Sequence, residues 1–237
     1  MSEPNTNSWN YVEQLLQNRS ALYLAIERET NSQAIMRGML LAILVGAAAF
    51  GAAVGSYRGG IQTLYAGIKF PLVLLGTAAI CAPVLTTLEM ALGRRARWRR
   101  DLMLVAAAMA IGSLALVALA PLIILGDVIG LSYHRFILLI GLCFCAAGGT
   151  MLKSLRTGIG NLTRSLALGR SMALLTVFAI VGMQMSWTFR PYVLRPRAEA
   201  VPFMRSLDGN LIEAAITSWH SARGQYSRDE APLPEGS

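Results

Sequence analysis

Five long apolar runs, separated by short polar or arginine-rich stretches, most constrain what this chain can fold into. Each run is about 20 residues or longer, enough for a helix to cross ~30 Å of hydrocarbon at ~1.5 Å per residue. Only 14% of the residues are charged and 54% are hydrophobic, whereas a soluble domain typically carries about 25% charged residues. The sequence therefore predicts an all-α, polytopic helical membrane protein. The five transmembrane helices are predicted at 38–57, 68–92, 102–126, 135–155 and 171–189.

The polar residues that flank this membrane domain, 36–190, predict amphipathic helices at both ends of the chain. In the N-terminal part, 1–35, apolar residues recur at helical spacing over 8–29, with a break expected near Ser20. The apolar face of this helix suits the membrane surface or the protein's own cytoplasmic face, and the pattern favours neither. Beyond the membrane domain we predict an extended segment and a second amphipathic helix in 191–223, and disorder in 224–237.

Basic residues indicate how the helices are oriented. Loop 93–100 has the densest cluster, and with it on the inside most of the basic residues near the first four spans also lie inside, as the positive-inside rule requires. We therefore predict the bacterial inner membrane, with a cytoplasmic N-terminus and an extracytoplasmic C-terminus. Contacts with anionic lipid headgroups account for the net charge of +8 without a nucleic-acid partner. The residues predicted to set topology and contact headgroups are Arg94, Arg95, Arg97, Arg99 and Arg100.

Small residues on the first span indicate close helix packing. Gly51 and Gly55 form a GxxxG motif, and Gly46 extends the same small-residue character. Glycines at this spacing let two helix backbones approach closely. The motif predicts tight packing but does not identify the helix that packs there.

The second span begins with "IKFPLVLLGTAAICAPVL" (68–85), which contains one lysine and two prolines. At the outer rim of the span, Lys69 is expected to keep its stem in hydrocarbon and its ammonium group among the headgroups. Pro71 then falls in the first helical turn, where its missing N–H costs nothing. Pro83 lies deeper in the span and is the one residue expected to kink it.

That kink would free the carbonyl of Ala79, which Thr86, Thr87 or a neighbouring helix is expected to accommodate. Polar groups inside a membrane are costly and are therefore candidates for function. Glu89 is expected to pair with Arg94 or Arg97, with an ion or proton role as the alternative.

Gln184, in the outer half of the fifth span, is expected to form a hydrogen bond with a neighbouring helix. Together with Pro83 and Glu89, it completes the set of candidate functional residues within the membrane.

The chain contains no recognisable enzyme motif. HExxH, GxSxG and phosphate-binding loop patterns are absent, and the two histidines, His134 and His220, lie far apart in sequence. We therefore predict a non-enzymatic protein without catalytic residues, cofactor or metal.

Two blocks of sequence carry a family resemblance. "GSYRGGIQTLYAGIKFPLVLLGTAAICAPVL" (55–85) and "VGMQMSWTFRPYV" (181–193) resemble a family of uncharacterised bacterial polytopic membrane proteins. The spacing of the five spans is also similar to that of Yip1-type membrane proteins. The first resemblance implies no function. The second implies a scaffold or trafficking role and identifies no site.

Two functions from different classes fit these features. The first is an anchor, scaffold or accessory subunit of a membrane complex that packs with protein partners or with further copies of itself. The second is a transporter or channel for an ion or small solute, with span 68–92 contributing to the path. The spans contain few ionisable groups, and this scarcity favours the first function.

Overall fold

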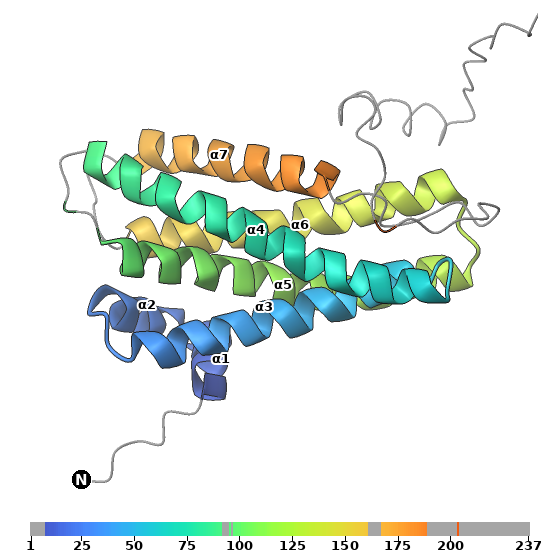
Figure 1. The fold of residues 1–237 in the computed structure, drawn as a ribbon, viewed down its shortest axis with the longest axis horizontal. Coiled ribbons are helices and arrows are strands. Elements are labelled where there is room, and N and C mark those ends of the chain that lie inside the picture. Colours follow the sequence, from blue (N-terminus) through green and yellow to red (C-terminus); the bar gives the residue numbers. More distant parts are fainter. Residues whose placement is uncertain (1–7, 92–94, 96, 161–166, 189–202, 204–237) are drawn as a thin grey trace, which may run out of the picture.

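The computed structural model describes residues 8–91, 95, 97–160, 167–188 and 203, and every regular element in them is an α-helix. This confirms the all-α class. A bundle of long helices carries two short ones at one end (Figure 1). The seven helices are α1 (Ser8–Gln17), α2 (Arg19–Glu27), α3 (Ser32–Gly55), α4 (Ile61–Ala91), α5 (Trp98–Val128), α6 (Tyr133–Gly160) and α7 (Ala167–Thr188).

The long helices α3 to α7 run side by side, and successive helices point in opposite directions (Figure 1). We call the end that holds α1, α2 and the beginning of α5 the head end. The central helix is α5, which packs against α3, α4 and α6. In its most apolar stretch 67% of the residues are buried, against 22% for α6. The apolar surface of α5 therefore forms the core, and much of that of α6 faces outward.

Four of the helices, α3, α4, α5 and α6, are long and apolar enough to cross a membrane. These correspond to four of the five predicted spans. In α7 the apolar stretch within the described residues is Thr176–Ser186, which is shorter than a span. The fifth span stays a prediction, and the C-terminal helix predicted in 191–223 lies outside the described residues.

The second span begins earlier than predicted. Residues 58–67 were expected to form a connection, but Gly59 and Gly60, both with positive φ, complete the turn, and α4 starts at Ile61. Between the two glycines and Lys69 only Gly67 opposes a helix, at a cost of about 1 kcal/mol. Pro71 consequently lies in the third turn of α4 rather than the first, and Lys69 lies two turns inside the helix.

The N-terminal segment forms two helices, with a break at Asn18, two residues from Ser20, near which it was predicted. The Asn18 side chain caps α2 by accepting a hydrogen bond from Ala21 N at 3.3 Å. Helix α1 packs against α3 and helix α2 against α5. The residues buried by this docking are Tyr11, Val12, Leu15, Leu22, Tyr23 and Ile26. One face of the amphipathic segment is therefore docked on the protein itself.

The predicted packing glycines of α3 lie against its neighbours within the bundle. A Cβ added at Gly46 would lie 3.0 Å from the carbonyl oxygen of Ser113 in α5. At Gly51 it would lie 2.5 Å from the carbonyl oxygen of Ala66 in α4, and at Gly55 2.6 Å from Thr63 Cα. Ser113 Oγ also donates a hydrogen bond to Ala42 O at 3.0 Å, which ties α5 to α3. The GxxxG motif thus serves the packing of α3 on α4 in the same chain.

Replacing Gly51 with alanine should destabilise the bundle. Its methyl group would lie 2.5 Å from a backbone oxygen, which cannot move aside as a flexible side chain can. Forcing the two helices apart should cost about 1–3 kcal/mol. The measurement is the free energy of unfolding from an SDS titration in mixed micelles.

The matched control is Gly148→Ala in α6, where nothing lies within 4 Å of the added methyl group. There the higher helix propensity of alanine should leave stability unchanged or raise it by about 0.5–1 kcal/mol. Equal effects of the two substitutions would contradict the packing described for α3.

Candidate functional site: a charge cluster at the head end

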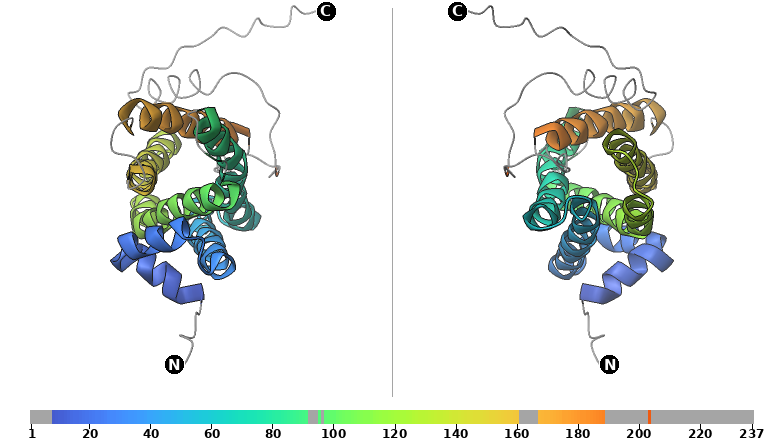
Figure 2. Two further views of the ribbon diagram at one scale, coloured as in Figure 1. Left: turned by 90° about the vertical axis from the view of Figure 1, so that its left-hand side faces the viewer. Right: turned by 90° about the vertical axis from the view of Figure 1, so that its right-hand side faces the viewer.

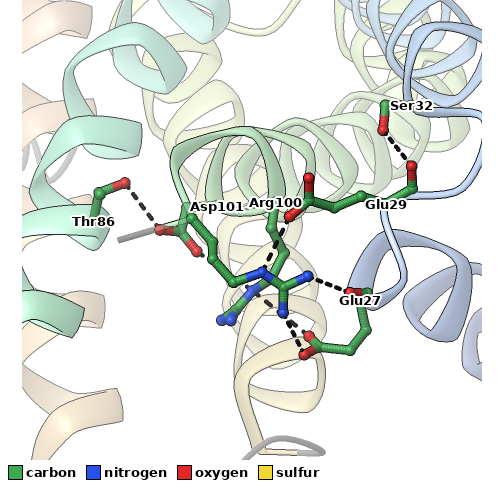
Figure 3. Close-up of polar contacts among 7 residues, drawn as sticks. Glu27, Glu29, Ser32, Thr86, Arg100 and Asp101 are labelled. Carbon is green, nitrogen blue, oxygen red and sulfur yellow. Dashed lines mark hydrogen bonds and ion pairs between the residues drawn. The ribbon is translucent and has the colours of Figure 1, made fainter. Parts of the chain in front are cut away.

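The head end holds a cluster of charged side chains that joins three parts of the chain (Figure 3). Two acidic residues come from the end of α2 and the turn that follows it, and two arginines and an aspartate come from the start of α5. A threonine near the end of α4 completes the cluster. We call these six residues the head cluster: Glu27, Glu29, Thr86, Arg97, Arg100 and Asp101.

The outer half of the head cluster is centred on Arg97. Its Nη1 lies 2.9 Å from Glu27 Oε1, and its Nε lies 3.1 Å from Glu29 Oε1. A further guanidinium N–H donates to the backbone carbonyl of Glu27. Because these three side chains are each about one-third exposed, solvent weakens the individual ion pairs. Their combined geometry nevertheless fixes the end of α2 against the start of α5.

The inner half is almost completely shielded from water. Arg100 is 5% exposed and Asp101 1%. Arg100 Nε lies 3.5 Å from Asp101 Oδ1 and 3.7 Å from Glu27 Oε2, distances typical of ion pairs rather than of hydrogen bonds. On the other side, Thr86 Oγ1 donates to Asp101 Oδ2 at 2.9 Å. Asp101 therefore connects Thr86 of α4 to Arg100 of α5.

Local structure explains why the aspartate is tolerated at this depth. Asp101 lies in the first turn of α5, where the helix dipole favours negative charge. Its backbone N–H donates to the carbonyl of Arg97, the residue that precedes the helix. The adjacent arginines provide compensating positive charge, without which a buried carboxylate would be strongly unfavourable.

A second polar contact ties α2 to the bundle near the head cluster. The hydroxyl of Tyr23 donates to the carbonyl of Ser154 in α6 at 3.0 Å. Burial raises the pKa of Tyr23, and the side-chain hydrogen bond from Ser154 only partly offsets this effect. Helix α2 is therefore bound by polar contacts to both α5 and α6.

Lys69 lies in a different environment from the predicted one. Its side chain is fully buried, and its Nζ lies 4.8 Å from the ring centroid of Phe203, within the range of a cation–π contact. The Phe203 ring also packs edge-on against Tyr65 at 5.2 Å. The expectation that Lys69 extends to the headgroups is therefore wrong, because α4 begins eight residues before it and a C-terminal residue covers it.

The structure describes the side chains of two of the three predicted candidates within the membrane. Pro83 and Gln184 are both exposed, on α4 and α7. The side chain of Glu89 lies outside the described residues. Thr86 and Thr87 donate to the carbonyls of Ala82 and Val84. The prediction that one of these threonines accommodates the carbonyl of Ala79 is therefore wrong, and the alternative of a neighbouring helix stays a prediction.

The predicted headgroup arginines divide into two groups. Arg95 and Arg99 are exposed, as a residue that contacts lipid headgroups must be. Arg97 and Arg100 instead pair with acidic residues of the same chain. Arg94 lies outside the described residues.

Sequence reasoning missed the acidic half of the head cluster. Asp101 directly follows the arginine-rich loop, at the start of a predicted span. An acidic residue next to arginines at that position was the one sequence feature that could have indicated a buried ion pair. Glu27 and Glu29 lie about 70 positions earlier, and no periodic pattern connects them to Arg97. Within the described part of the chain, no group of three or more histidine, cysteine, aspartate or glutamate side chains could hold a metal ion.

The length and apolar composition of four of the described helices place the chain in the class of helical, multi-pass membrane proteins. No protein-family model, curated protein or solved structure matches it. The resemblances to an uncharacterised bacterial family and to Yip1-type proteins therefore stay predictions. What the chain does must be inferred from its own contacts.

Replacing Asp101 with alanine should destabilise the protein strongly. The change removes the carboxylate that faces buried Arg100, and breaking a buried ion pair in this way costs about 3–5 kcal/mol. Thr86→Val should cost less, about 1.5–3 kcal/mol, because only one hydrogen bond to a charged group is lost. Both losses can be measured by SDS titration in mixed micelles.

The matched control is Thr157→Val. Its exposed hydroxyl donates to Lys153 O within the same helix, so the change should stay within about 0.5 kcal/mol of zero. If Asp101→Ala were as mild as this control, the inner half of the head cluster would not contribute to stability.

Proposed function

We propose that this protein is a non-enzymatic anchor, scaffold or accessory subunit of a membrane complex. The observation that carries the proposal is the head cluster. Its five charged side chains are used to hold α2 on the bundle, where they stabilise a fixed surface at the head end. A fixed surface of docked helices is what a partner protein needs for recognition without a large ordering cost.

The polar groups of the spans support the same proposal. Hydroxyl groups on several spans donate to backbone carbonyls of their own helix, as Thr77 does to Val73 and Thr150 to Ala147. Such bonds satisfy polar side chains locally. Hydroxyls used in this way are poor candidates for lining a solute path.

We further propose the bacterial inner membrane as the location, with the head end in the cytoplasm. Exposed arginines support this orientation because Arg28, Arg95 and Arg99 all belong to the head end. A fifth span formed by α7 would then place the C-terminus outside.

A transporter or channel is the second candidate, and buried Lys69 favours it. A lysine two turns inside a span is the kind of group that marks an ion or solute path. The same helix contains Pro71 and Pro83, and proline-interrupted helices are common at transporter binding sites. The well-packed contacts of α4 with α3 and α5 weigh against this candidate.

The test begins with purification from the membranes of the native host in a mild detergent, followed by mass spectrometry. A scaffold should retain a defined protein partner at constant stoichiometry through gel filtration. Reconstituted alone, it should move ions and small solutes no faster than empty vesicles. A reproducible flux without a retained partner would contradict the proposal.

Two lysine variants separate the candidates. If the second candidate holds, Lys69→Met should abolish the flux, whereas Lys153→Met, at an exposed position on α6, should leave it unchanged. The chain contains no other lysine, so the pair isolates the buried one. Under the scaffold proposal neither variant alters permeability.

A further inference from the structure

The outward face of α1 carries two large apolar side chains that its docking on α3 leaves uncovered. Trp9 is 57% exposed and Leu16 56%. They are seven residues apart and therefore lie on the same side of the helix. The neighbouring side is buried and holds Tyr11, Val12 and Leu15. On the exposed side, polar residues border the two apolar side chains: Asn10, Glu13 and Gln17.

The position of α1 along α3 places Trp9 near the boundary of the hydrocarbon. A Cβ added at Gly38 would lie 2.5 Å from the carbonyl oxygen of Ser8, so the start of α1 touches α3 at that residue. Arg37 is the last charged residue of α3, and none follows before Gly55. The membrane-facing surface of α3 therefore begins where Trp9 lies.

Helix α3 exposes large apolar side chains immediately after the residue at which α1 touches it. The large apolar side chains of α3 that are exposed just beyond Gly38 are Leu40, Leu41, Leu44 and Val45. If α3 crosses a membrane, these side chains face lipid. A helix that touches α3 at Gly38, next to Arg37, then lies at the level between headgroups and acyl chains.

The direction of α1 fits the same location. Helices α1 and α2 run across the long axis of the bundle, whereas α3 to α7 run along it (Figure 2). A helix perpendicular to the spans lies parallel to the membrane plane. Amphipathic helices in this orientation bind the membrane interface, and tryptophan is enriched at that depth.

We infer that α1 lies in the membrane interface, with Trp9 and Leu16 in contact with lipid while its buried side stays docked on α3. Glu13, exposed on the same side as Trp9 and Leu16, keeps the helix at the level of the headgroups because its carboxylate stays in water. The inference goes beyond the proposed function, since it requires no protein partner.

Depth-dependent fluorescence quenching tests the inference. In a single-tryptophan chain, with Trp98, Trp187 and Trp219 changed to phenylalanine, Trp9 is observed in nanodiscs of phosphatidylcholine and phosphatidylglycerol. Doxyl groups at carbon 5 of the lipid should quench Trp9 more strongly than doxyl groups at carbon 12. Aqueous iodide should quench it weakly. Strong iodide quenching without an effect of either doxyl lipid would overturn the inference.

A tryptophan at position 45, in a chain without the four natural ones, is the matched control. Val45 lies seven residues beyond Gly38, which is roughly 10 Å deeper along α3, and its side chain is 59% exposed. The carbon-12 label should quench it more strongly than the carbon-5 label. If neither label quenches it, α3 does not face lipid there, and the inference fails with it.

Spin labels give a second measurement that keeps the natural tryptophans. After Cys145→Ser removes the exposed cysteine, a label at Leu16→Cys should collide more often with oxygen than with a water-soluble nickel complex. A label at Gln33→Cys, exposed in the first turn of α3 before Arg37, should show the reverse. Preference for the nickel complex at both positions would also overturn the inference.

Discussion

The electrostatic cost of charge near a membrane controls how this protein is assembled. A carboxylate or guanidinium that leaves water must find a partner of opposite charge, or the structure is strongly destabilised. Here Asp101 and Arg100 are shielded from water at the start of the central helix, and Glu27 and Arg97 continue the network toward solvent. Helix α2 is held because it brings Glu27 and Glu29 to this network. The position of α2 and the contact of α4 with α5 through Thr86 and Asp101 both depend on it.

Packing along the bundle follows a complementary rule. Where helices lack charges to join them, close approach of backbones at small residues provides the contact. Gly38, Gly46 and Gly51 on α3 each lie against a backbone carbonyl of a different helix. One helix thereby positions α1, α5 and α4. The structure thus combines an electrostatic attachment at the head end with close packing along the spans.

Much of this fold could be predicted from sequence, because hydropathy and length alone define membrane-spanning helices. Four of the spans and the two-part N-terminal segment follow from periodicity. Lys69 was misplaced because two consecutive glycines form a shorter turn than the polar stretch suggested, which moved the helix start by seven residues. The head cluster could not be predicted because Glu27 and Arg97 are about 70 positions apart, and no local pattern records which charges meet in space.

The most direct test of this account measures whether α2 is held by the head cluster. Hydrogen exchange followed by mass spectrometry, on the protein in nanodiscs, reports the protection of the amides in Arg19–Glu27. The account predicts slow exchange in the unchanged protein and faster exchange in Arg97→Gln, with no change in the amides of α5 beyond its first turns. Exchange of α2 as fast as that of an unstructured peptide in the unchanged protein would contradict it, because α2 would then not be docked on the bundle.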